Sequence, residues 1–227
     1  MMVMKESIYT IPVNEVFEES CGCPICRMET TLEERCIEYI LGAAMMEPDI
    51  RIETNKQGFC KKHLAVMLGK GNKLSLALML ETHLAEVKNN TLNSKKGITN
   101  KKKAKKMEKA VSSCYVCNKV GNAVAHMIDS IFRMYKNSDE FKEIYESTDM
   151  FCLPHYERLS ELAISEINDK KLLLRFCEKS TEIVTRNITE LIDDVHHFAE
   201  MFDYRNSGEN ADWGNSKDSL ERTAEFL

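Results

Sequence analysis

Apolar residues recur at helical spacing through most of this 227-residue chain. Two series step by three and four residues, which places each on one face of a helix. The earlier series is Met28, Leu32, Cys36, Tyr39 and Ala43, and the later one is Val120, Val124, Met127, Ile131 and Met134. Pro48 is expected to end or interrupt the earlier helix, because proline lacks an amide donor and clashes with the preceding turn. A shorter helix is predicted after each series, at about 139–146 in the later case.

More helical segments are predicted downstream of these two series. Apolar runs cover 64–68 and 74–87 in the first half of the chain, and 156–167 and 171–202 in the second. No segment shows the persuasive alternation of apolar and polar residues that marks a half-buried strand. The nine glycines and four prolines are about half the average usage, which argues against a turn-rich β sandwich or barrel. The predicted fold class is therefore all-α.

The spacing of cysteine and histidine indicates an internal duplication. Each half reads C-x2-C, a spacer and then F-C-x2-H, and the order and approximate spacing are the same in both. The motif residues are Cys23, Cys26, Cys60 and His63 in the first half and Cys114, Cys117, Cys152 and His155 in the second. We therefore predict a helical bundle built from two tandem similar halves at 1–88 and 111–206, with a linker at 89–110 and a tail at 207–227.

Three thiolates and one imidazole form a closed tetrahedral ligand set for zinc. We expect each half to be stapled by its own Cys3His site, so that the chain holds two Zn²⁺ ions. Sites with four protein ligands are usually structural, whereas a catalytic zinc keeps one position open for water. An iron–sulfur cluster with one histidine ligand is the alternative metal centre, and buried free cysteines are the alternative without a metal.

The other cysteines and histidines lack this spacing. Cys21 lies two residues before Cys23 and is either an exchangeable, redox-sensitive ligand or an unligated neighbour of the site. Cys36 and Cys177 fall on apolar helical faces and are expected in the core. The remaining histidines are expected on polar faces or with local hydrogen-bond partners; they are His83, His126, His196 and His197.

The segment between the halves is strongly basic. Residues 88–109 contain nine lysines and one acidic residue, so they carry a net charge of +8 in a chain of net charge −5. Asparagine, serine and glycine in the front half predict a flexible linker, and the back half could belong to the helix leading to Cys114. Lys101–Lys106 could neutralise nucleic-acid phosphates. Because aromatic residues are missing from this cluster, a solvated linker is the favoured interpretation.

The N-terminal residues show no signal-peptide core, and no apolar run approaches the roughly twenty residues that span a bilayer. We therefore expect no membrane contact and a reducing cytoplasmic location, in which cysteines serve as ligands or reactive thiols before they form disulfides. The composition, 43% hydrophobic and 30% charged, is that of an ordinary globular protein.

No catalytic motif supports an enzyme, since a phosphate-binding glycine loop, a G-x-S-x-G turn and an H-E-x-x-H helix are all missing from the sequence. The predicted function is a metal-stapled binding or scaffold module for an unidentified protein or small molecule. The alternatives are a thiol-redox or metal-responsive protein and a nucleic-acid-binding protein.

The doubled motif, the run Phe202-Asp203-Tyr204-Arg205-Asn206 and the following Trp213 resemble an uncharacterised bacterial domain-of-unknown-function family, DUF6062. The resemblance spans nearly the whole chain and implies a bacterial cytoplasmic protein, but it implies no activity. Asp203, Tyr204 and Arg205 could form a polar pocket or a docking site. Fixation of the helix end, with Arg205 paired to a carboxylate, is the favoured interpretation.

Overall fold

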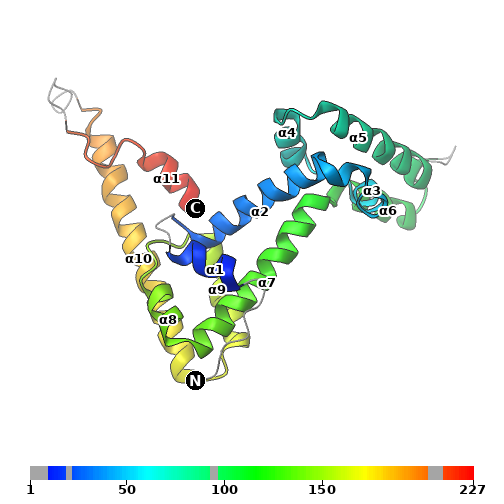
Figure 1. Ribbon diagram of the computed structural model, residues 1–227. Helices are drawn as coiled ribbons and strands as arrows, with labels where there is room; N and C mark the ends of the chain where they lie inside the picture. Colours follow the sequence, from blue (N-terminus) through cyan, green and yellow to red (C-terminus); the bar gives the residue numbers. More distant parts are fainter. Residues whose placement is uncertain (1–9, 19–21, 93–96, 204–211) are drawn as a thin grey trace. The chain divides into compact units, whose positions relative to one another are not determined.

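The computed structural model describes residues 10–18, 22–92, 97–203 and 212–227 (Figure 1). All regular elements within these ranges are helical, which confirms the all-α prediction. The first helices are α1 (Thr10–Glu18), α2 (Pro24–Leu41), the 3-10 helix η1 (Ala43–Met46), α3 (Pro48–Gln57), α4 (Lys61–Gly69) and α5 (Lys73–Val87). They are followed by the π-helix η2 (Lys88–Leu92), α6 (Lys101–Ser112), α7 (Tyr115–Asn137), α8 (Asp139–Glu146), α9 (Leu153–Glu166), α10 (Lys170–Glu200) and α11 (Ser219–Phe226).

The end of α2 differs from the prediction. The helix stops at Leu41, ahead of Pro48, because Gly42 and the short helix η1 interrupt it. Pro48 instead occupies the first turn of α3, where its missing amide hydrogen leaves no helical hydrogen bond unmade. None of the described helices is both long and apolar enough to cross a membrane.

The chain forms two compact units that differ from the two sequence halves. The first unit combines the residues up to 28 with 126–227, and the second unit is 29–125. The division falls inside α2 and inside α7, so each of these helices begins in one unit and ends in the other. With 18 and 23 residues, they carry the chain about 27 and 35 Å along their axes. The segment after each helix therefore lies in a different unit from the motif before it.

The core of the first unit is aromatic. The Tyr145 ring stacks on Phe176 with centroids 4.9 Å apart, and Tyr135 contacts both rings edge-on. The Tyr145 hydroxyl and Ser180 Oγ are 2.8 Å apart, which gives this fully buried phenol a hydrogen-bond partner. Phe151 packs against Tyr145 and directly precedes Cys152, so the aromatic core holds the start of α9 in place.

The core of the second unit is mainly aliphatic. It is formed by Ile37, Ile40, Leu41, Met67, Leu76, Met79, Cys114, Tyr115 and Val116. Cys36, Phe59 and Cys60 are partly buried against it. The two motif cysteines, Cys60 and Cys114, thus reach one core from segments that lie far apart in the sequence.

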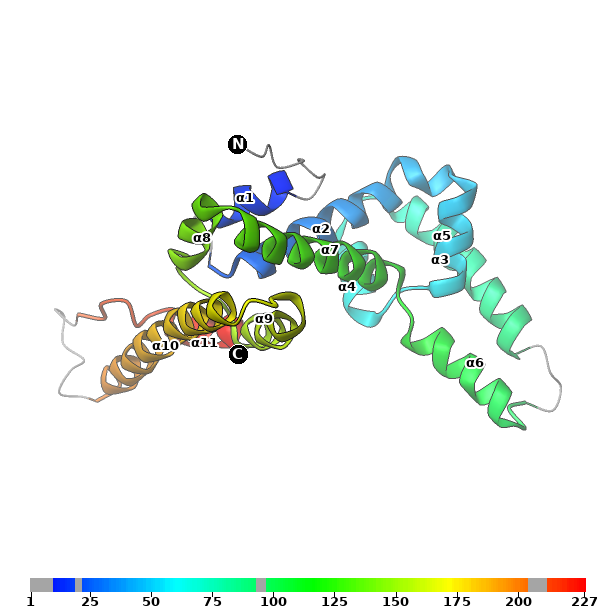
Figure 2. The same cartoon turned by 90° about the horizontal axis from the view of Figure 1, so that it is seen from below.

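The basic segment contains regular structure (Figure 2). Asn100 caps α6, because its side-chain oxygen accepts a hydrogen bond from the backbone amide of Lys103 at 3.0 Å. Ser113 is extended and separates α6 from α7, so the predicted helix leading to Cys114 exists but ends one residue before Ser113. Part of the predicted linker, 93–96, lies outside the described residues.

Candidate metal centres

The structure gathers the eight motif residues into two groups, each with three cysteines and one histidine. The first site consists of Cys23, Cys26, Cys152 and His155, and the second site of Cys60, His63, Cys114 and Cys117. The ligand types agree with the prediction, but the pairing within each sequence half was wrong. The first site combines the first C-x2-C motif with the second C-x2-H motif, and the second site combines the second C-x2-C motif with the first C-x2-H motif. Because α2 and α7 each begin in one unit and end in the other, each C-x2-C motif belongs to a different unit from the C-x2-H motif that follows it in the sequence.

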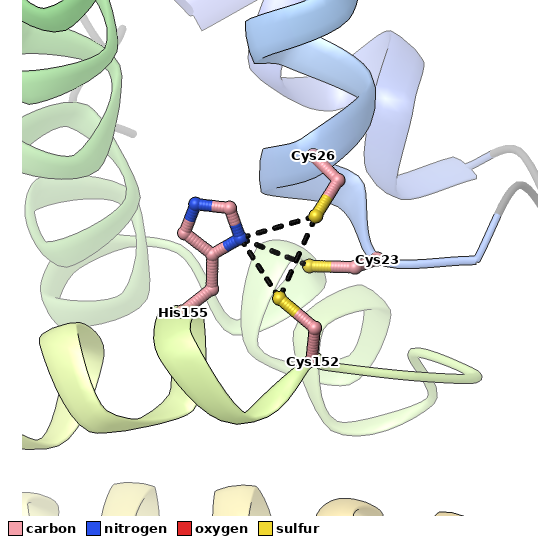
Figure 3. Close-up of side chains that lie close together, drawn as sticks. All are labelled: Cys23, Cys26, Cys152 and His155. Atoms are coloured by element: carbon pink, nitrogen blue, oxygen red, sulfur yellow. Dashed lines mark hydrogen bonds between the residues drawn. The ribbon is translucent and has the colours of Figure 1, made fainter. Parts of the chain in front are cut away.

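In the first site, the sulfur atoms surround one ring nitrogen of His155 (Figure 3). The distances from His155 Nδ1 to the Sγ atoms of Cys152, Cys26 and Cys23 are 3.1, 3.3 and 3.5 Å. The Sγ atoms of Cys26 and Cys152 are 3.5 Å apart. Cys23, Cys152 and His155 are buried and Cys26 is half-buried, so little of this site faces water.

The second site has the same arrangement around His63. Its Nδ1 lies 3.2 Å from the Sγ atoms of Cys60 and Cys114 and 3.4 Å from that of Cys117. The Cys60 and Cys117 sulfur atoms are 3.9 Å apart. Cys117 is exposed and Cys60 is half-buried, so this site is more open to solvent than the first.

These distances fit a tetrahedral zinc ion. Zn–S bonds of about 2.3 Å and Zn–N bonds of about 2.0–2.1 Å require S···S and S···N separations of roughly 3.8 and 3.6 Å. The observed separations of 3.5–3.9 Å between sulfurs and 3.1–3.5 Å between sulfur and nitrogen are close to these values. They are far too long for a disulfide, and all described cysteines are free thiols.

Every motif lies across the start of a helix. Cys60 and Cys152 precede the first residues of α4 and α9 in extended conformation, and the histidine three residues later lies in the first turn. Cys23 and Cys114 directly precede α2 and α7 in the same way, with the second cysteine in the first turn. A spacing of three residues brings both side chains to one side of the helix. Each site therefore lies at two helix N-termini, whose partial positive charge favours thiolates.

Two thiols of the first site have pKa values shifted in opposite directions. Hydrogen bonds from Cys152 and Cys26 lower the pKa of Cys23 well below its usual range, although burial opposes this. Hydrogen bonds with Cys152 and Cys23, together with burial, raise the pKa of Cys26. A thiolate held by neighbouring thiols in a buried cluster is a strong ligand for a divalent cation.

A carboxylate that belongs to no sequence motif lies beside the imidazole of His63. Its Nε2 is buried without a hydrogen bond of normal length, and Glu33 Oε2 lies 3.4 Å away. Lys62 Nζ is 2.7 Å from the same oxygen. Burial raises the pKa of Glu33, but the hydrogen bond and charge of Lys62 and the nearby His63 outweigh burial and lower it. A histidine that directs Nε2–H at a carboxylate presents Nδ1 to a metal.

We expect Glu33→Ala to weaken metal binding at the second site by about 10- to 100-fold, the usual effect of losing such a partner. Competition with a chromophoric zinc chelator measures this change. Glu38→Ala is the matched control, because Glu38 lies on the same helix and its carboxylate pairs with Lys70 rather than with His63. Equal affinities for the Glu33→Ala variant and the control would show that Glu33 does not orient His63.

His83 lies beside the segment that leads to Cys60. Its Nδ1 donates a hydrogen bond to the carbonyl of Asn55 at 2.8 Å. A Cβ added to Gly58, which has a φ of 62°, would lie 2.4 Å from the His83 ring. Glycine is therefore required here, two residues before Cys60, so that the chain can turn under the imidazole.

The other candidate residues lie apart from both sites. Cys36 and Cys177 are half-buried and belong to neither group. Two of the remaining histidines have local polar partners: His196 Nε2 lies 3.4 Å from Glu200, and His197 Nε2 lies 2.9 Å from the carbonyl of Asp212. His126 is 3.9 Å from Asp129. Cys21, Tyr204 and Arg205 lie outside the described residues, so their predicted roles stay predictions.

Comparison with known proteins identifies one family. The model of a family of unknown function, DUF6062, matches residues 4–227. No curated protein and no solved structure matches the chain significantly.

Proposed function

We propose that this chain, which belongs to DUF6062, a family of unknown function, is a zinc protein whose two closed Cys3His sites stabilise a helical binding module. The crossed ligand sets carry this proposal. Cys23 and His155 are 132 residues apart in the sequence, and Cys60 and Cys117 are 57 residues apart. An ion bound at either site would link distant segments and so contribute its binding energy to folding.

A structural role fits the shape of both sites. Each site supplies four protein ligands, which would occupy all four coordination positions of a tetrahedral zinc ion and leave none for substrate or activated water. The ligands are anchored at helix starts that pack on the core of their own unit, so the ion would fix one helix relative to another. We extend the proposal to a bacterial, cytoplasmic protein with an internal repeat, since C-x2-C begins α2 and α7 and F-C-x2-H begins α4 and α9.

Metal analysis of anaerobically purified protein, combined with an absorption spectrum, tests the proposal. We expect two zinc ions per chain and no absorption band in the visible range. Detection of iron together with a visible charge-transfer band would show that the sites hold an iron–sulfur cluster instead of zinc. A metal-free chain that keeps its full stability in chelator would contradict the proposal.

The second candidate function is a thiol-based sensor, and the exposure of Cys117 favours it. An oxidant such as a peroxide would reach this ligand more readily than the buried cysteines of the first site. Partial burial of its sulfur and the thiols of Cys114 and Cys60 raise the pKa of Cys117 to about 12, which disfavours its thiolate when no metal is bound. Reversible loss of one zinc ion on oxidation would support this function over a purely structural one.

A further inference from the structure

The second unit carries an open polar groove beside the basic helix α6. Its volume is about 710 Å³, and its walls come from α3, the end of α5, η2, α6 and the start of α7. Lysine and side-chain amide groups dominate the lining: Lys56, Lys106, Lys109, Gln57, Asn118 and Asn122. Such a surface offers hydrogen-bond donors and positive charge together.

The lysines of α6 form one continuous face. Residues four apart lie above one another on a helix, which aligns Lys101, Lys105 and Lys109 in one row and Lys102 and Lys106 in the next. Together the two rows cover about 140° of the helix surface. All five side chains are exposed, and none has an ion pair or hydrogen bond with a described residue. Their positive charges are therefore available to a partner.

The carboxylates near the groove are engaged locally. Glu53 accepts a hydrogen bond from Gln57 at 3.0 Å and lies 3.4 Å from Lys56, and Glu86 accepts one from Asn90. These pairs leave Lys106 and Lys109 as the groove cations without a partner among the described residues. On α6 itself, Glu108 is the one acidic residue.

The groove is joined directly to the second metal site. Ser113 Oγ donates a hydrogen bond to the Gln57 carbonyl at 2.7 Å, and Asn118 Nδ2 donates to Gln57 Oε1 at 2.7 Å. The Tyr115 amide donates to the Gly58 carbonyl at 2.9 Å. These contacts connect the segments that bear Cys60 and Cys114, so an ion at the second site would hold the groove walls together.

We propose that this groove and the lysine face of α6 bind the phosphodiester backbone of a nucleic acid. The inference rests on the proposed function, because the metal-stapled second unit forms the groove. The five lysines lie along a helix about 18 Å long, so the face presents closely spaced positive charges. A nucleic-acid duplex carries about one negative charge per 1.7 Å, and this dense row of phosphates matches the lysine spacing better than the scattered carboxylates of an acidic protein. Lysines contact phosphates, and Asn122, which lines the groove and has no side-chain hydrogen bond among the described residues, adds an amide for contact with a sugar or base edge.

Fluorescence anisotropy with a short labelled DNA duplex and with single-stranded RNA of the same sequence tests this inference. The full-length, zinc-loaded chain is titrated between about 50 and 200 mM salt, and we expect the logarithm of the affinity to fall linearly with the logarithm of salt concentration. The triple variant Lys101→Gln, Lys105→Gln and Lys109→Gln should weaken binding at least about tenfold at the lowest salt and reduce the slope by about three. The two probes distinguish duplex DNA from single-stranded RNA as the source of the phosphates.

The matched control removes the same charge from exposed lysines of the first unit, by Lys170→Gln, Lys171→Gln and Lys217→Gln. This control should bind nearly as well as the unmodified chain. Equal losses in both variants, equal affinity of the α6 variant and the unmodified chain, or equally effective competition by polyglutamate would overturn the inference.

Metal content is measured on the same samples. A chain with two zinc ions that binds neither probe overturns the groove inference and leaves the structural zinc proposal intact. A chain without zinc that remains stable overturns the proposed function instead, and binding by that chain would show that the groove does not depend on the metal.

Discussion

A chain carrying Cys23→Ala and Cys152→Ala should still bind one metal ion, whereas a chain carrying Cys23→Ala and Cys60→Ala should bind none. In the first variant both substitutions fall in the first site, so the second site keeps all four ligands. In the other variant each site loses one thiolate, and a site with three ligands has lost the closed tetrahedral set that holds zinc tightly. The two variants have the same number of cysteines, so the comparison isolates the pairing.

The measurement is zinc per chain after dialysis against a moderate chelator. Cys36→Ala with Cys177→Ala is the control, because these thiols belong to neither site and should leave two ions bound. If pairing followed the sequence halves, the result would reverse: the Cys23 and Cys60 variant would keep one ion and the Cys23 and Cys152 variant would lose both.

Removal of both ions should unfold most of the chain. Structural zinc contributes an apparent 10–16 kcal/mol in small domains, roughly as much as the whole stability of a typical domain at 5–15 kcal/mol. We therefore expect a strong chelator to abolish most of the far-ultraviolet helical signal at room temperature, and zinc, but not magnesium, to restore it.

The single tryptophan provides an independent measure for the first unit. Trp213 contacts Phe198 and Phe202 with ring centroids 5.7 and 6.0 Å apart, so its emission should shift to longer wavelength when this unit unfolds. In the chain carrying Cys23→Ala and Cys152→Ala, this shift should be present before any chelator is added. An unchanged helical signal and unchanged emission in metal-free protein would show that the cores alone stabilise the fold.

The local structure of this protein could be predicted well from its sequence. The apolar periodicity located α7 because this helix buries one face, the short helix predicted at 139–146 is α8, and the C-x2-C and C-x2-H spacings identified all eight metal-ligand candidates. The number of residues between two side chains predicts whether both can bind one ion from the same helical turn, because the geometry of a turn is set locally.

The pairing could not be predicted in the same way. Which motif meets which depends on where the helices between them end, and α2 and α7 end in the opposite unit from their start. Glu33 was missed for a related reason: it carries no motif of its own, and its partner His63 lies 30 residues later in the sequence. The two side chains meet because α2 and α4 both contribute to the core of the second unit.

The crossed ligand sets also determine the order in which the sites can be completed during synthesis. The second site has all its ligands once Cys117 has left the ribosome, but the first site must wait for His155. Cys23 precedes His155 by 132 residues in the sequence. The ribosome therefore adds His155 on the order of 10 s after Cys23 at ordinary elongation rates. During that interval Cys23 and Cys26 lack the other two ligands of their site, so a metal ion bound during synthesis would enter the second site before the first.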